Sequence, residues 1–253
     1  MGRNRYVLLL LLIFPLFSQG SEKAENLFVK GNDLYAKGKY KEAAASYEQV
    51  LSAGYFSAEV YFNLGNAYYK QEEIPLAILN YEKAGKLSPG DDDIKVNIQL
   101  ANLKIADKID AVPEFFLTKW WRSFLLFCPA EVLSVLSAAG FLLGFALLVV
   151  YLFAVSITIK RPAFYSGIVL LVLALLITCM ASLQTSYLKR SNGAIVFAGT
   201  VNVKSGPKDS FKTLFVIHEG LKVSVTAQNE GWIRIGLPNG NVGWITAASV
   251  KKI

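Results

Sequence analysis

The stretch FVKGNDLYAKGKYKEAAASYE at residues 28–48 recurs, with substitutions, as FNLGNAYYKQEEIPLAILNYE at residues 62–82. The two copies are offset by 34 residues and share seven identical positions. Small residues at shared positions (Gly31 and Gly65, Ala43 and Ala77) let paired helices approach closely, and the shared Tyr47 and Tyr81 fill the space between them. A fixed period of this length predicts stacked helix–turn–helix repeats.

This pattern resembles the tetratricopeptide repeat, which implies a small all-α solenoid. We predict a repeat domain over residues 21–110, with repeats at about 24–57 and 58–91. Pro89 is expected to end the last repeat helix. Three aspartates from Asp91 onward and the helical spacing of isoleucines through Ile105 predict a capping helix at 91–108, which covers the open end of the stack.

Four asparagines fall on or near the concave face of such a solenoid: Asn32, Asn63, Asn66 and Asn97. Amide side chains can pair with both the N–H and the C=O groups of an extended peptide, so these residues are candidates for a peptide-binding groove. Carboxylate-clamping tetratricopeptide proteins have lysines where this chain has Phe28 and Asp93, which argues against that version of the groove. The alternative is that the asparagines are solvated or join neighbouring helices.

Outside the repeats, apolar residues are concentrated in long segments without charges, which explains a mean hydropathy of +0.38. Residues 132–159 and 163–188 each exceed the roughly 20 residues that cross a bilayer, so we predict two transmembrane helices. Only Lys160, Arg161 and Pro162 separate them. This short connection predicts an antiparallel hairpin with both flanking regions on one side of the membrane.

The N-terminus predicts export. Residues 1–20 have a basic start, an apolar core and a small-residue exit, the pattern of a secretory signal peptide; the alternative is an uncleaved anchor helix. Export places the N-terminal and C-terminal regions in the periplasm and the turn in the cytoplasm. The expected location is therefore the bacterial inner membrane, crossed twice.

Residues 111–131 form a linker with an interfacial composition. Trp120 and Trp121 lie beside Lys119 and Arg122, and this mixture of aromatic and basic side chains is typical of a membrane–water interface. We expect a short helix here that contacts lipid headgroups.

Residues 191–253 change to short β-branched runs separated by Gly, Pro and Asn. Alternating pairs such as Ile233 and Ile235, together with an Asn239-Gly240 turn, predict a small all-β barrel. The segments VNVKSGP, HEGLKV, EGWIRI and GNVGWI make it resemble the bacterial SH3-like domain. Trp232 and Trp244 are candidates for a ligand-binding face, and the alternative is that they pack the barrel.

The net charge of +7 is unevenly distributed. Residues 21–110 carry 11 lysines and 14 acidic residues, whereas residues 189–253 carry 9 basic and 3 acidic residues. An exported chain without a Lys/Arg-rich run is not expected to bind nucleic acid. The basic C-terminal region is expected either near anionic lipid or against the acidic repeats.

No constellation of residues predicts catalysis, a cofactor or a metal ion. His218 is the single histidine, with no thiol nearby, and neither a P-loop nor a dinucleotide fingerprint is present. Cys128 and Cys179 are expected to be unpaired membrane-compatible residues; redox sensing through either is an open alternative. We therefore predict a protein that is not an enzyme.

The order of these parts, with the linker DKIDAVPEFFLTKWWR at 107–122, resembles the E-type members of the bacterial Bat (aerotolerance) family over nearly the whole chain. The resemblance implies a role in oxidative-stress tolerance beside membrane-anchored von Willebrand A-domain proteins and a MoxR-type ATPase. The sequence thus predicts a multidomain membrane protein that acts as a scaffold for protein partners. A second hypothesis is a cell-wall sensor that binds peptidoglycan through the SH3-like domain.

Overall fold

The computed structural model describes residues 18–109, 115–190 and 192–253. Most of the predicted signal peptide lies outside the described residues, as do residues 111–114 of the linker. The chain divides into two units. The first combines the repeat helices with Gly193–Ile253, and the second contains the two long apolar helices, so the second unit is inserted into the sequence of the first.

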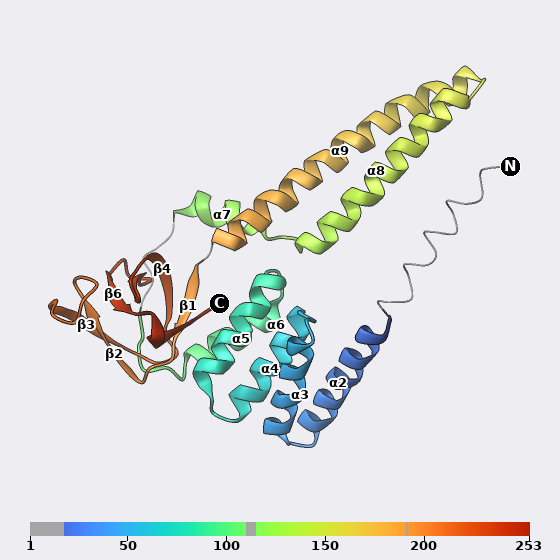
Figure 1. The fold of residues 1–253 in the computed structure, drawn as a ribbon. Helices are drawn as coiled ribbons and strands as arrows, with labels where there is room; N and C mark the ends of the chain where they lie inside the picture. The colour runs from blue at the N-terminus through green and yellow to red at the C-terminus, as the bar shows by residue number, and fades with distance from the viewer. Residues whose placement is uncertain (1–17, 110–114, 191) are drawn as a thin grey trace. The chain divides into compact units, whose positions relative to one another are not determined.

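Five helices build the repeat region, and successive helices run antiparallel (Figure 1). They are α2 (Ser18–Ala36), α3 (Tyr40–Ser52), α4 (Ala58–Lys70), α5 (Ile74–Leu87) and α6 (Asp92–Asn102). Side-chain caps mark the starts of two of these helices. The Ser57 hydroxyl accepts a hydrogen bond from Val60 N at 3.1 Å, and Asp91 Oδ1 accepts one from Ile94 N at 3.2 Å. These two caps begin α4 and α6.

Helix α6 ends earlier than the predicted capping helix. The predicted helix runs to residue 108, whereas α6 ends at Asn102. The following segment turns toward the sheet, because Ile105 packs against both the repeat core and the sheet core and Ile109 packs against the sheet core. Burial against a second domain, which helical periodicity does not encode, determines this boundary.

The C-terminal part is an antiparallel sheet of seven strands in the order β3-β2-β6-β5-β4-β1-β7 (Figure 1). The strands are β1 (Gly193–Val196), β2 (Thr200–Lys204), β3 (Thr213–His218), β4 (Lys222–Asn229), β5 (Trp232–Gly236), β6 (Val242–Thr246) and β7 (Val250–Lys252). Residues that alternate along the strands fill its core, including Val203, Ile233 and Ile235. The Asn239-Gly240 turn joins β5 to β6, with Gly240 at φ +88°.

Repeats and sheet share buried residues within the first unit. Strand β1 is buried on both faces: Ala194 and Val196 belong to the core of the sheet, whereas Ile195 packs with Ile78 and Tyr81 of α5. Two polar contacts reinforce this packing. Lys222 Nζ lies 2.6 Å from Glu82 Oε2, and Lys86 Nζ donates to Ile253 O at 3.0 Å.

The segment after α6 forms a second connection to the sheet. The backbone N–H of His218 donates to Asp107 Oδ2 at 2.6 Å, and His218 Nδ1 lies 2.8 Å from Asp107 Oδ1. Close by, a methyl group added to Gly220 would lie 2.4 Å from Ile105 Cγ2. The segment 104–109 therefore lies directly on the β3–β4 turn.

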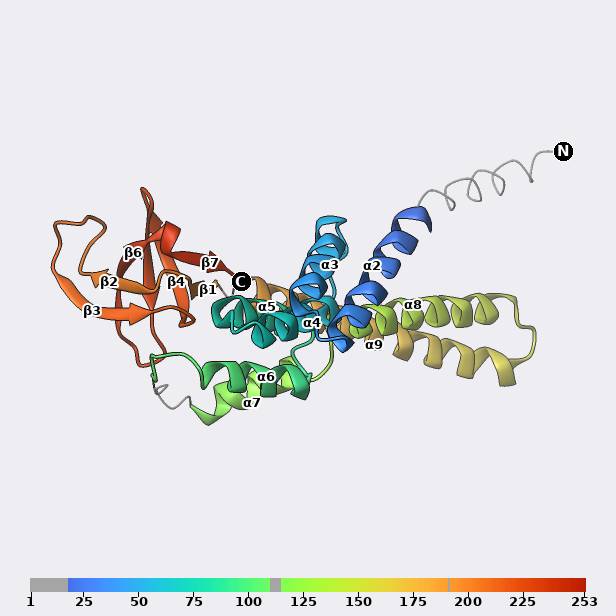
Figure 2. The same cartoon turned by 90° about the horizontal axis from the view of Figure 1, so that it is seen from below.

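The second unit contains α7 (Phe116–Leu125), α8 (Ala130–Phe153) and α9 (Ile157–Arg190). Helices α8 and α9 lie side by side along their length (Figures 1 and 2). Both are long and apolar enough to cross a membrane. Their backbones approach closely at two glycines, since a methyl group on Gly144 would lie 3.2 Å from Gly167 O. Cys128 and Cys179 are free.

The turn between α8 and α9 is not at Lys160-Arg161-Pro162, as the sequence predicts, but at residues 154–156. Ser156 begins α9, because its carbonyl accepts hydrogen bonds from Ile159 N and Lys160 N at 3.2 and 3.0 Å. Pro162 lies inside the helix, where it removes only one hydrogen bond close to the helix start. A helix start six residues before the predicted one thus outweighs the charged pair and the proline.

Candidate functional site

The four candidate asparagines form two identical hydrogen-bonded sets, which we call the asparagine ladder. Asn32 Oδ1 accepts from the Tyr47 hydroxyl at 2.8 Å and from Asn63 Nδ2 at 3.1 Å. One repeat later, Asn66 Oδ1 accepts from the Tyr81 hydroxyl at 2.8 Å and from Asn97 Nδ2 at 2.9 Å.

Each set of the ladder joins three consecutive helices. The first set takes one residue each from α2, α3 and α4, and the second takes one each from α4, α5 and α6. The asparagines therefore do join neighbouring helices. Among the described residues no hydrogen bond reaches the side-chain oxygens of Asn63 and Asn97, so these two half-buried acceptors are open to a peptide N–H. A peptide-binding role for the ladder stays a prediction.

The tyrosine hydroxyls keep their donor role because their surroundings favour the neutral form. Burial raises the pKa of Tyr47 to about 12, with smaller contributions from Tyr35 and Glu59. Burial also raises the pKa of Tyr81. The sequence reveals these tyrosines only as large packing residues; their shared offset of 34 with the asparagines is the signal that could have indicated the pairing.

Trp232 and Trp244 are half-buried and alternate with the core residues along their strands. Along β5, the buried Ile233 and Ile235 alternate with Trp232 and the exposed Arg234. Trp244 of β6 is paired with Arg234 on one side and with Lys204 of β2 on the other. Side chains at paired positions are neighbours, so a row of two cations and two half-buried tryptophans crosses three strands. Whether this row binds a ligand stays a prediction.

The predicted interfacial residues lie on α7. Trp120 is 64% exposed and Trp121 is 50% exposed, and both rings contact Phe124 at centroid distances of 6.1 and 6.0 Å. Lys119 and Arg122 belong to the same helix. This short helix thus exposes tryptophans together with basic residues, a composition typical of a membrane interface.

Two family models match the chain. Residues 28–92 match the tetratricopeptide repeat, and residues 199–251 match the bacterial SH3 domain. The two module types predicted from the sequence are confirmed. A comparison with curated proteins found no match.

The classes of the two modules determine what chemistry to expect. Tetratricopeptide repeats and SH3 domains typically bind proteins, or in bacteria the cell wall, and typically are not catalytic. Within the described ranges, no group of three or more His, Cys, Asp or Glu residues is placed to hold a metal ion. His218 is paired with Asp107 at the contact between repeats and sheet. The asparagine ladder and the outward tryptophans are therefore candidates for binding surfaces.

Proposed function

We propose that this chain is a non-enzymatic scaffold of the bacterial inner membrane, anchored by α8 and α9, that presents its repeats and its SH3-like domain to protein partners in the periplasm. The observation that carries the proposal is that the two interaction modules pack against one another through Ile195, while an apolar helix hairpin is inserted between them in the sequence. Partner surfaces on both modules are thereby held in one body.

The same observation supports the proposed membrane topology. Because repeats and sheet pack as one unit, both ends of the inserted hairpin have to emerge on one side of the membrane, which two crossings satisfy. The predicted signal peptide assigns that side to the periplasm. Reporter fusions after Arg161 and after Ile253 test this: we expect the first to be cytoplasmic and the second periplasmic. A cytoplasmic C-terminal fusion would contradict the proposed topology.

The resemblance to E-type Bat proteins supports a specific context, an aerotolerance complex with membrane-anchored von Willebrand A-domain proteins and a MoxR-type ATPase. Affinity purification of the full chain from detergent-solubilised membranes should recover proteins of these classes. Asn63→Ala, which removes an open acceptor of the ladder, should reduce their recovery several-fold. Asn202→Ala, at an exposed position of β2, is the matched control. Recovery of none of these classes would refute the complex.

A second candidate function, peptidoglycan binding, is favoured by the outward row of Lys204, Trp244, Arg234 and Trp232. Peptidoglycan offers sugar rings that stack on aromatic side chains and carboxylates that pair with cations. If this reading holds, the full chain in detergent sediments with purified peptidoglycan and Trp244→Ala reduces the bound fraction. Phe211→Ala, another exposed aromatic of the same domain, is the control. No sedimentation of the parent chain removes this function.

A further inference from the structure

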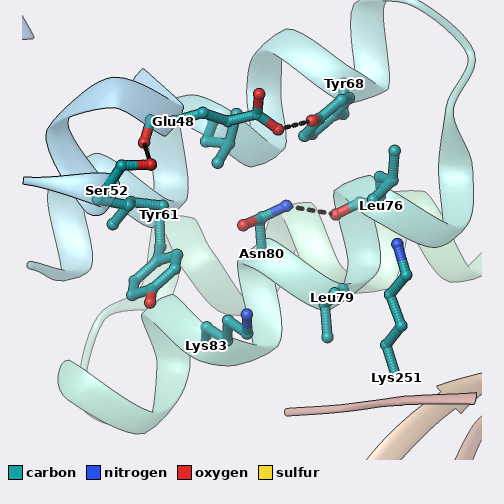
Figure 3. A pocket seen from close by; sticks show the side chains of 11 residues that line it. Glu48, Ser52, Tyr61, Tyr68, Leu76, Leu79, Asn80, Lys83 and Lys251 are labelled. Atoms are coloured by element: carbon teal, nitrogen blue, oxygen red, sulfur yellow. Dashed lines mark hydrogen bonds between the residues drawn. The ribbon is translucent and has the colours of Figure 1, made fainter. Parts of the chain in front are cut away.

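A pocket of about 500 Å³ lies between the repeats and the sheet of the first unit, on the side of helices α3, α4 and α5 (Figure 3). It does not include the asparagine ladder or the tryptophan row. Figure 3 shows Lys83 from α5 and Lys251 from β7 reaching it from different elements, with Leu79 between them. The pocket is thus completed only when both modules are docked.

The pocket combines an apolar floor with a few polar groups. Leu51, Leu64, Leu76 and Leu79 contribute aliphatic surface. Asn80 is nine-tenths buried, and its Nδ2 donates to Leu76 O at 2.8 Å (Figure 3). Because this bond fixes the amide, its Oδ1 is held as an acceptor for an N–H group. Aliphatic surface with a few fixed polar groups is the usual composition of a ligand site.

Positive charge exceeds negative charge in this pocket. Its one carboxylate, Glu48, accepts a hydrogen bond from the Tyr68 hydroxyl (Figure 3). Lys83 Nζ lies over the Tyr61 ring at 5.4 Å, and Lys251 Nζ lies over the Phe197 ring at 4.3 Å. Across the described ranges, neither ammonium forms an ion pair with a carboxylate. Each cation is therefore stabilised by an aromatic face and has no anion beside it.

Burial and a neighbouring positive charge destabilise the Lys83 ammonium. Burial, followed by the charge of Lys251, lowers the pKa of Lys83 below its ordinary value. An anion bound between them would relieve both effects, because opposite charge compensates for lost hydration. Of the two adjacent lysines of β7, Lys251 lines the pocket and Lys252 does not.

We propose that this pocket binds an acidic side chain of a partner protein's peptide segment, with the carboxylate between Lys83 and Lys251 and a flanking apolar side chain on the leucines. A bare phosphate ion would leave most of the volume and the aliphatic surface unused, whereas a few peptide residues fill both. A backbone N–H of the same segment donates to Asn80 Oδ1. The inference rests on the proposed function in one respect, that the partner is a protein.

Coupling between the modules is a direct consequence of this site. One lysine comes from the repeats and the other from the sheet, so a bound carboxylate adds a contact that bridges the two. An acidic segment therefore binds the docked arrangement and stabilises it. The full chain, rather than either module alone, is the species to test.

The test uses the full chain in phosphatidylcholine nanodiscs and two pools of hexapeptides with capped ends and a neutral fluorescent dye. The pools share mixed apolar positions and differ only in a central Glu or Gln. By fluorescence anisotropy we expect the Glu pool to bind about tenfold more tightly, the scale of one charge-assisted hydrogen bond. Lys83→Gln and Lys251→Gln should each remove most of this preference, and Lys252→Gln should retain it.

Equal binding of the two pools would overturn the proposal, as would an undiminished preference in a Lys83→Gln chain whose melting temperature matches the parent. Inorganic phosphate that binds as tightly as the Glu pool would show a simple anion site and also overturn it. Failure here is separable from failure of the scaffold. If affinity purification recovers partners equally well from the parent and from Lys83→Gln, the pocket proposal falls and the scaffold stands. If the parent chain recovers no partner but the Glu preference of the peptides is present, only the scaffold falls.

Discussion

At the scale of single residues, the repeats depend on a tyrosine ring packed on a glycine. A methyl group added to Gly65 would lie 2.6 Å from the ring of Tyr81, which is buried and hydrogen-bonded to Asn66. The ring cannot move aside without losing that bond. We expect Gly65→Ala to destabilise the full chain by about 1–3 kcal/mol, the usual cost of overpacking. Thermal denaturation in detergent, followed by circular dichroism, measures the effect.

Gly85 on α5 is the matched control. A methyl group there would meet its nearest neighbour, Ile94 Cγ2, at an ordinary 3.6 Å. Because alanine is the better helix former, Gly85→Ala should be neutral or should stabilise the chain by up to about 1 kcal/mol. Equal effects of the two substitutions would show that the ring–glycine contact does not limit the packing.

Tyr47 should make the free energy of unfolding depend on pH in the alkaline range. Its pKa is raised by burial to about 12, against an ordinary value near 10 in the unfolded chain. Between about pH 10 and 12 the unfolded state loses this proton while the folded state keeps it, so stability falls as pH rises through that window and is unaffected below it. Tyr47→Phe should give a shallower fall in melting temperature from pH 10 to 12. Parallel curves for parent and variant would contradict this assignment.

The sequence predicts which repeat positions share a role, but it does not predict their hydrogen-bond partners. The sequence identifies Asn32, Asn66 and the two repeat tyrosines, because repetition marks positions with a shared role. Which atom each side chain bonds depends on interhelical distances that spacing alone does not supply. Lys83 and Lys251 were missed entirely, because only the docking of two modules brings them to one pocket.

At the scale of elements, the segment between α6 and α7 depends on Asp107. Its carboxylate accepts the backbone N–H of His218 and contacts the imidazole. Removing it leaves a half-buried donor without a partner, so Asp107→Ala should destabilise the chain by about 1–3 kcal/mol. Asp209→Ala, at an exposed position of the same sheet's β2–β3 connection, should change stability by less than about 0.5 kcal/mol. Chemical denaturation of both variants checks the contrast.

The bounds of helices and strands could be predicted where the local residue pattern agrees with the pattern of burial. Six β-branched segments predict strands, and each overlaps one of β1 to β6: 194–197, 201–204, 214–217, 221–226, 232–235 and 242–245. Strand β7 was missed because it is short, carries Lys251 and Lys252, and is defined by pairing with β1. The end of α6 was missed because burial of Ile105 and Ile109 against the sheet determines it. The turn at 154–156 was missed because apolar residues continue on both sides of it.

At the scale of the whole molecule, charge asymmetry indicated a contact that the structure contains. An acidic repeat region and a basic sheet predict attraction, with anionic lipid as the alternative partner. Glu82 of the repeats forms an ion pair with Lys222 of the sheet. The opposite charges favour contact between repeats and sheet, but they do not determine which residues meet. The apolar residues Ile195 and Ile105 determine where the two modules meet.

Because β1 packs on α5, a cavity made at Ile195 in the sheet should also destabilise the repeats. Ile195 and Ile245 are both fully buried in strands, but Ile195 packs on α5 and Ile245 packs inside the sheet. Truncation to alanine should cost about 2–5 kcal/mol at either site. Hydrogen exchange of the full chain should then differ: Ile195→Ala accelerates exchange of α5 amides, whereas Ile245→Ala accelerates exchange mainly in β5 and β6. If both variants leave α5 equally protected, the modules fold independently, and the bridging pocket would lose its structural basis.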